Sequence, residues 1–80
     1  MSDIAVIGLG RLGLPLALTF ARAGFQVEGV EKDPERFHLL KQKKSPIPEP
    51  GVQELLANAS NFQVIPQAAM STSPIVFIAV

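Results

Sequence analysis

Near its start the chain reads Ile4-Ala5-Val6-Ile7-Gly8-Leu9-Gly10-Arg11-Leu12-Gly13. Its opening apolar run is rich in β-branched residues and predicts a short strand over Asp3–Ile7. Because the run is continuous rather than alternating, it is typical of a central parallel strand that is covered on both faces. Good helix formers follow the glycines as far as Ala23. The expected order is therefore a strand, a glycine loop, and a helix that begins near Gly10 or Arg11.

The three glycines have the spacing G-x-G-x-x-G, which in this strand–loop–helix context is typical of a dinucleotide-binding loop. Gly8 would let the chain turn sharply, Gly10 would let the backbone approach a pyrophosphate, and Gly13 would let the helix pack closely on the sheet. The first N–H groups of the helix would then face the anion, at the positive end of the helix dipole. A tight turn with no ligand is the alternative, although one glycine would suffice for such a turn.

An acidic residue follows the second predicted strand, Phe25–Val30, at the position where a dinucleotide-binding fold needs one. Glu31 comes 18 residues after Gly13, close to the roughly 20 at which such a side chain meets the adenine ribose. It would accept hydrogen bonds from the ribose hydroxyls and repel a 2′-phosphate, which favours NAD over NADP. Lys32 and Arg36 leave the opposite preference open, because nearby cations could accommodate that phosphate. A solvated charge at a strand end is the alternative without a ligand.

The rest of the chain predicts helices and strands in alternation. Asp33 suits a helix N-cap and Pro34 the first helical position. In the first helix, Leu12, Leu16 and Phe20 recur at helical spacing and are expected to form its core stripe. The other expected elements are a helix from Gly51 to about Asn58, a strand over Asn61–Ile65, one helical turn over Gln67–Ser71 and a strand over Ile75–Val80.

Composition excludes several classes of function. The 80 residues carry a formal net charge of zero, so neither nucleic acid nor an anionic membrane is an expected partner. There is no cysteine, and His38 is the single histidine, so we expect no metal site and assign His38 to the surface. No apolar run reaches the roughly 18–20 residues that span a bilayer, and no signal peptide is evident. The expected compartment is the cytoplasm.

Several segments together resemble the N-terminal part of the UDP-sugar 6-dehydrogenases, such as UDP-glucose and UDP-N-acetylmannosamine dehydrogenases. The glycine loop alone occurs in many dehydrogenases, whereas the proline-rich segment about 40 residues later is much more specific. The residues that carry the resemblance are Ile7–Ala17, Gly24-Phe25, Gly29-Val30-Glu31, Pro46-Ile47-Pro48-Glu49-Pro50-Gly51-Val52 and Val76–Val80.

The resemblance implies an NAD site and no catalytic residue within these 80 residues. It implies that the pyrophosphate lies against the glycine loop, that Glu31 binds the ribose, and that Arg36 assists. The family oxidises the sugar C6 alcohol to a carboxylate through a cysteine, and the chain has none. Position 11, commonly Tyr in the family, is Arg here. The loop residues that the resemblance assigns to the pyrophosphate are Gly8, Gly10, Arg11, Leu12 and Gly13.

We therefore expect an α/β chain with a truncated Rossmann fold, in which a parallel sheet of strand order 3-2-1-4 has helices on both faces. Residues 1–80 would form one partial dinucleotide-binding domain without a second domain. The last strand would be an apolar sheet edge, so self-association is expected. Two other functions stay open: a non-catalytic dinucleotide-binding module or remnant, and an NAD(P)-dependent dehydrogenase of the hydroxyacid or 6-phosphogluconate type.

Overall fold

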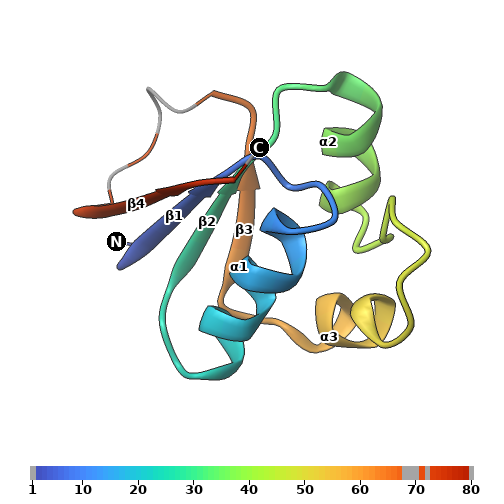
Figure 1. Ribbon diagram of the computed structural model, residues 1–80, viewed down its shortest axis with the longest axis horizontal. Helices are drawn as coiled ribbons and strands as arrows, with labels where there is room; N and C mark the ends of the chain where they lie inside the picture. Colours follow the sequence, from blue (N-terminus) through green and yellow to red (C-terminus); the bar gives the residue numbers. More distant parts are fainter. Residues whose placement is uncertain (1, 68–70, 72, 80) are drawn as a thin grey trace.

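The computed structural model describes residues 2–67, 71 and 73–79. They form an α/β unit in which three helices pack on a four-stranded sheet (Figure 1). The elements in chain order are β1 (Ile4–Ile7), α1 (Gly13–Arg22), β2 (Val27–Val30), α2 (Pro34–Lys41), α3 (Val52–Asn58), β3 (Phe62–Ile65) and β4 (Ile75–Ile78).

The strand order is β3-β2-β1-β4, and every neighbouring pair is parallel. This confirms the predicted order 3-2-1-4. The strands are paired without a register shift, so their last residues form one row across the sheet. That row consists of Ile65, Val30, Ile7 and Ile78. Strands β2 and β3 are added on one side of β1, and β4 is added on its other side. The point where the strand order switches in this way is where ligands bind in folds of this kind.

The hydrophobic core lies between one face of the sheet and the helices. Alternate strand residues point to this face, as the pleat requires. Its sheet side is formed by Ile4, Val6, Val27, Phe62 and Val64. Its helix side is formed mainly by Leu14, Ala17, Leu18 and Ala21 of α1, Leu40 of α2, and Val52 and Leu56 of α3. Packing in this core therefore fixes the position of α1, whose first residue is the last glycine of the loop.

The prediction of helices on both faces is wrong for the described residues, because α1, α2 and α3 all lie on the same side of the sheet (Figure 1). The crossovers from β1 to β2 and from β2 to β3 move in the same direction, and right-handed crossovers then place their helices on one face. Only the connection between β3 and β4 reverses direction, and it is short. The helical turn expected at 67–71 falls largely on residues 68–70, which lie outside the described residues.

The predicted core stripe of the first helix is also wrong at its start. Leu12 is 72% exposed, and the buried face of α1 consists of Gly13, Leu14, Ala17, Leu18 and Ala21. Helix α1 begins at Gly13, two to three residues later than expected. The small side chains at 13, 17 and 21 let the helix approach the sheet, so Leu12 is turned outward at the rim of the glycine loop.

The predicted start of the second helix is confirmed, whereas the second strand starts later than predicted. Asp33 is the N-cap of α2 and accepts a hydrogen bond from the Arg36 N–H at 3.1 Å. Pro34 is the first residue of that helix. Strand β2 begins at Val27, two residues later than predicted, because the Gln26 N–H is bound by the Asp3 carboxylate at 2.8 Å. The other predicted helix and strands differ from the observed ones only at their ends, apart from the turn expected at 67–71, and Val80 of the last predicted strand lies outside the described residues.

Candidate functional site

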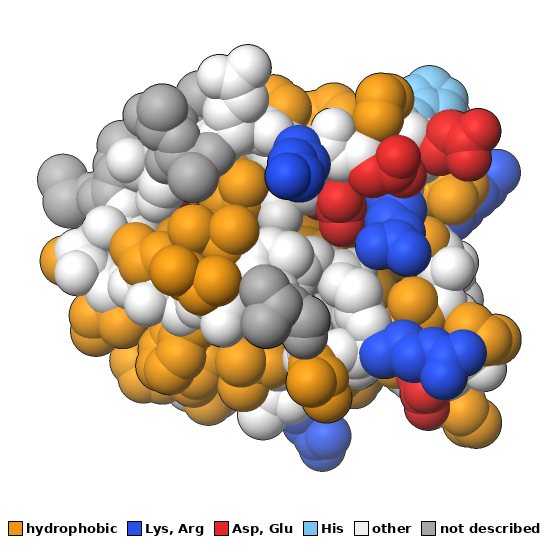
Figure 2. Space-filling model, turned by 45° about the horizontal axis from the view of Figure 1, so that its top comes forward, with side chains coloured by type: hydrophobic (Ala, Val, Ile, Leu, Met, Phe, Trp, Pro, Cys, Tyr) orange, Lys and Arg blue, Asp and Glu red, His pale blue; other side chains and the backbone are white. Residues whose placement is uncertain are grey.

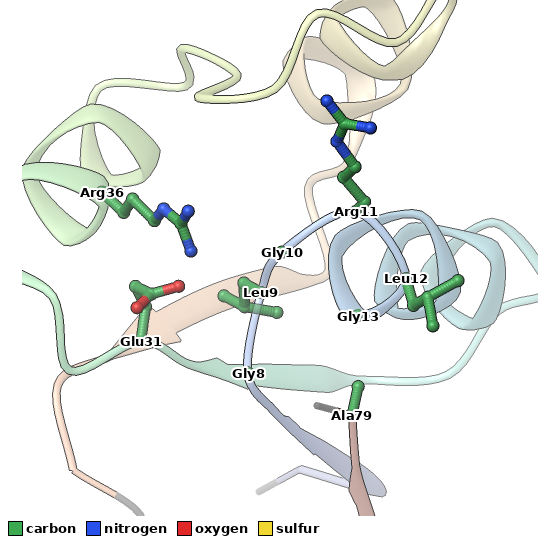
Figure 3. Close-up of a pocket in the computed structure, with 9 residues that line it drawn as sticks. All are labelled: Gly8, Leu9, Gly10, Arg11, Leu12, Gly13, Glu31, Arg36 and Ala79. Atoms are coloured by element: carbon green, nitrogen blue, oxygen red, sulfur yellow. The ribbon is translucent and has the colours of Figure 1, made fainter.

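A pocket of about 230 Å³ opens at the carboxyl edge of the sheet, between the glycine loop and the start of α2 (Figure 3). It brings together all seven residues predicted to bind the cofactor. Its lining consists of Gly8, Leu9, Gly10, Arg11, Leu12, Gly13, Glu31, Arg36 and Ala79. Leu9 and Ala79 are additions that the sequence did not predict.

Two of the motif glycines are required by the fold itself. Gly8 has a φ of +91°, which favours glycine, and a Cβ there would overlap the carbonyl oxygen of Ala79. A Cβ at Gly13 would overlap the carbonyl oxygen of Gly8. The loop is held between the strands by hydrogen bonds from the Gly8 N–H to the Val30 carbonyl, 3.0 Å, and from the Ala79 N–H to the Ile7 carbonyl, 2.8 Å. These contacts fix the distance between strand and helix.

Gly10 differs from the other two because its missing side chain leaves open space toward the pocket. The nearest atom to a Cβ built at Gly10 is Nη1 of Arg36, at 4.0 Å. Within the described part of the chain, no hydrogen bond uses the N–H groups of Gly10, Arg11, Leu12 or Gly13, and no side chain caps α1. Unpaired N–H groups at the positive end of a helix dipole form an anion site.

Leu9 anchors the glycine loop in the core, and the sequence analysis did not predict this role. Leu9 is fully buried. Its Cδ1 would lie 2.6 Å from a Cβ at Gly29, and two ring atoms of Phe62 would lie within 2.9 Å of the same Cβ. Gly29 thus provides the space that Leu9 and Phe62 occupy. A glycine inside a strand is a known signal of such close approach.

Glu31 offers a buried hydrogen-bond acceptor to the pocket. It is only 6% exposed, and its Oε2 accepts a hydrogen bond from the Asp33 N–H at 3.1 Å. Its Oε1 is buried and has no hydrogen-bond partner among the described residues. Leaving such an atom unpaired costs about 1–3 kcal/mol or more for a charged group. An oxygen held in this state is ready to accept a hydrogen bond from a ligand.

The two arginines of the pocket differ in direction (Figure 3). Arg36 extends from α2 toward Glu31 and the space over Gly10, whereas Arg11 points away from that space toward α3. Arg36 therefore brings a positive charge beside the unpaired amides, and Arg11 lies at the outer rim. Leu12 also lies at the rim, exposed to solvent.

A second, more apolar pocket of about 450 Å³ adjoins the first on the helix-free side. Its walls come from the ends of β1, β2 and β4 and from the residues that follow β1, β2, β3 and β4. It shares Gly8, Glu31 and Ala79 with the first pocket and adds Ile7, Val30, Lys32, Pro66, Gln67 and Ile78. A flat apolar group could lie there while the group attached to it reaches Glu31.

Neither a metal centre nor a membrane span is found in the described residues. No group of three or more His, Asp or Glu side chains there could hold a metal ion. None of the described helices is long and apolar enough to cross a bilayer. His38 lies on the exposed surface of α2, where its Nε2 contacts the Gln42 Nε2 at 2.9 Å.

Comparison with known proteins gives one consistent relationship. Residues 2–80 match the family model described as the NAD-binding domain of the UDP-glucose/GDP-mannose dehydrogenase family. UDP-glucose 6-dehydrogenase of Pseudomonas aeruginosa is 38% identical over 82 residues, which cover 96% of this chain and 18% of that protein. UDP-N-acetyl-D-mannosamine dehydrogenase of Methanococcus maripaludis is 41% identical over 61 residues, which cover 76% of this chain and 14% of that protein.

Solved structures agree with the sequence relatives. A UDP-glucose dehydrogenase from Pyrobaculum islandicum superposes with a TM-score of 0.93 at 30% identity, covering 100% of this chain and 20% of its own. A ternary complex of GDP-mannose dehydrogenase from Pseudomonas aeruginosa superposes with a TM-score of 0.89 at 31% identity, and the match covers 98% of this chain and 19% of that one. The chain thus spans about a fifth of the length of these proteins. It belongs to the UDP-glucose/GDP-mannose dehydrogenase family and corresponds to the family's NAD-binding domain, with a Rossmann-type fold.

Proposed function

We propose that residues 1–80 form the first part of the dinucleotide-binding domain of an enzyme that oxidises the C6 alcohol of a UDP-sugar to a carboxylate. The observation that supports this most strongly is one pocket whose lining holds both the unpaired amides at Gly10–Gly13 and Glu31, whose Oε1 has no partner among the described residues. An anion site and a buried acceptor in one pocket suit a pyrophosphate joined to a ribose.

Each predicted residue then has a physical role. The amides at positions 10–13 bind the pyrophosphate oxygens, and Gly10 leaves room for them because it has no Cβ. Arg36 neutralises part of the phosphate charge. Glu31 accepts hydrogen bonds from the adenine ribose, and the adjoining apolar pocket takes the adenine ring. Arg11 and Leu12 contribute mainly through their backbone, because the Arg11 side chain points away (Figure 3) and Leu12 is exposed.

The bound NAD would accept the hydride that leaves the sugar. The residues of this chain bind and orient the dinucleotide, and none of them is proposed as nucleophile or base. The UDP-sugar is proposed from the names of the relatives, UDP-glucose and UDP-N-acetyl-D-mannosamine dehydrogenases. Its contacts would be made by parts of such an enzyme beyond the matched segment. We also propose the cytoplasm as the compartment of this NAD-dependent reaction, which cell fractionation would test.

The proposal is tested by titrating the chain with NAD and with NADP in a calorimeter. We expect NAD to bind more tightly, because the carboxylate of Glu31 repels a 2′-phosphate. Equal affinities, or a preference for NADP, would contradict the role of Glu31. No binding of either dinucleotide would contradict the proposed function itself.

We also propose that the chain self-associates through β4. Large apolar side chains gather over this edge strand, on the left of the face seen in Figure 2, away from the charged groups near α2. All four β4 residues are exposed, between 41% for Phe77 and 72% for Ile78, and none is charged. An uncharged apolar edge pairs readily with another strand. With a net charge of zero, two copies have little long-range repulsion to overcome.

A further inference from the structure

Glu28 is a buried acidic residue that has no role in the proposed nucleotide site. It lies in the middle of β2 and is only 6% exposed. Its side chain points to the helix-free face, opposite to the neighbouring Val27, which belongs to the core. The residues beside it in register are Ala5 on β1 and Gln63 on β3. Acidic side chains are almost never buried so completely without partners.

Two serines from the connection between β3 and β4 bind this carboxylate. The hydroxyls of Ser71 and Ser73 both donate to Oε1 of Glu28, each at 2.9 Å. The Ser73 N–H in turn donates to the Ser71 hydroxyl oxygen at 3.2 Å. Hydrogen bonds to a charged acceptor are stronger than neutral ones. Glu28 therefore attaches the returning part of this connection to the middle of the sheet.

The outgoing part of the same connection forms a wall of the apolar pocket. Pro66 and Gln67 follow β3 directly and line that pocket, whose floor includes Val30. Val30 lies two residues beyond Glu28 on the same face of β2, about 7 Å along the strand. Glu28, to which the serines are attached, and Val30, in the floor of the apolar pocket, are thus neighbours on the helix-free face of β2. Pro66 and Gln67 continue directly from β3, and Ser71 and Ser73 are bound by Glu28.

We propose that Glu28 is a positioning residue for the adenine end of the nucleotide site. Its carboxylate holds Ser71 and Ser73 against the sheet, a few residues along the chain from Pro66 and Gln67, and so helps to keep those two residues in place as a wall of the apolar pocket. This role rests on the proposed binding of NAD. Without the attachment, Ser71 and Ser73 move away from the sheet, Pro66 and Gln67 are less firmly held, and the adenine loses packing while the pyrophosphate amides at positions 10–13 are unchanged.

Two measurements on four variants test the proposal. The variants are Glu28→Ala, Glu28→Gln, the double variant Ser71→Ala/Ser73→Ala, and the control Gln63→Ala, which changes the exposed neighbour of Glu28 on the same face. Hydrogen exchange compares the amides of the connection with those of β1. Calorimetry gives the affinity for NAD. Glu28→Gln keeps a side-chain oxygen that can accept both serine hydroxyls, so it serves as the conservative rescue.

We expect Glu28→Ala to speed exchange at the amides of positions 67, 71 and 73 at least tenfold, and the serine double variant to do so at positions 67 and 71, while β1 stays protected. Position 73 is left out for the double variant because that variant removes the Ser71 hydroxyl that accepts from its N–H. Both should weaken NAD binding about tenfold, because the adenine loses packing against Pro66 and Gln67. Glu28→Gln and Gln63→Ala should stay within about threefold of the unchanged chain.

Three results would overturn the proposal. Unchanged exchange in the connection would show that Glu28 does not hold it. Faster exchange there with unchanged NAD affinity would show that the attachment does not position the pocket wall. An equal rise of exchange in β1 would show that Glu28 stabilises only the fold. If the unchanged chain binds no NAD, the proposed function fails together with the positioning role, whereas the exchange data still decide the attachment.

Discussion

The α-carbon of Gly13 lies so close to the carbonyl oxygen of Gly8 that a Cβ at position 13 would overlap it. This contact joins the first turn of α1 to the end of β1, beside the pocket proposed for the nucleotide. Gly8 is constrained in turn by the Ala79 carbonyl oxygen and by its own positive φ. Gly10, between them, has no such contact. The three glycines of the motif therefore serve two different purposes, and substitutions should separate them.

Replacing Gly13 with Ala should destabilise the fold by roughly 3 kcal/mol or more, because backbone atoms cannot yield to the new Cβ as a flexible side chain would. Gly8→Ala should behave similarly. Urea denaturation followed by circular dichroism measures the loss. Unfolding free energies equal to that of the unchanged chain would show that the close contact between strand and helix is not present.

Replacing Gly10 with Ala should leave the unfolding free energy within about 0.5 kcal/mol of the original value, because the space is open. The same change should weaken NAD binding at least about tenfold, since the new methyl group occupies the space of the pyrophosphate. Calorimetry measures the affinity. An unaltered affinity would mean that the pyrophosphate does not pass over Gly10.

Replacing Glu31 with Gln should weaken NAD binding about tenfold, as expected for lost hydrogen bonds between the ribose hydroxyls and a charged acceptor. It should also reduce the preference for NAD over NADP, because the repulsion of the 2′-phosphate is removed. Glu35→Gln is the matched control, since Glu35 is an exposed residue in the first turn of α2. Parallel titrations of both dinucleotides give both quantities. The interpretation fails if the two variants behave alike.

Replacing Arg36 with Ala should lower NAD affinity about fivefold at low salt, and the difference from the unchanged chain should shrink as the salt concentration rises. Arg36 is exposed on α2 and extends over Gly10 (Figure 3), so its charge acts on the phosphates through a partly solvated path. Arg22→Ala removes an exposed arginine from the far end of α1 and serves as the control. A salt-independent loss, or an equal loss in both variants, would argue against a charge effect on the phosphates.

Introducing Lys at Val76 or Ile78 should reduce self-association, because a charge on an exposed sheet edge opposes pairing with another strand. Both residues are exposed on β4, Ile78 by 72%. Ala57→Lys adds the same charge at an exposed position of α3. Sedimentation velocity over a range of concentrations should show association for the unchanged chain and the Ala57 variant, and a monomer for the β4 variants. A monomeric unchanged chain would contradict the proposed contact.

The local signals in the sequence were sufficient for seven of the nine residues that line the main pocket, and together with the topology typical of dinucleotide-binding folds they gave the order of the strands. The glycine spacing, the acidic residue at 31 and the N-cap at Asp33 each act over a few neighbouring residues, so they can be recognised without the fold. Arg36 joined the pocket because Asp33 and Pro34 fix where α2 begins. The structure then adds the direction of each side chain.

Features that depend on packing were not predictable in this way. Leu12 fits a helical stripe with Leu16 and Phe20, but the contact between Gly13 and Gly8 turns a different face of α1 toward the sheet. The packing of Leu9 against Gly29 is formed between residues 20 positions apart. Glu28 could have been noticed as an acidic residue within an apolar strand, but its partners come from a connection more than 40 residues away.

The central claim, that bare backbone amides at the start of α1 bind the pyrophosphate of NAD, is tested most directly by amide NMR during an NAD titration. We expect the largest chemical-shift changes at the amides of Gly10, Arg11, Leu12 and Gly13. The amide of Glu31 should also shift, and the amides of α3 should change little. A titration in which these amides stay unperturbed while NAD binds elsewhere, or in which no resonance moves at all, would contradict it.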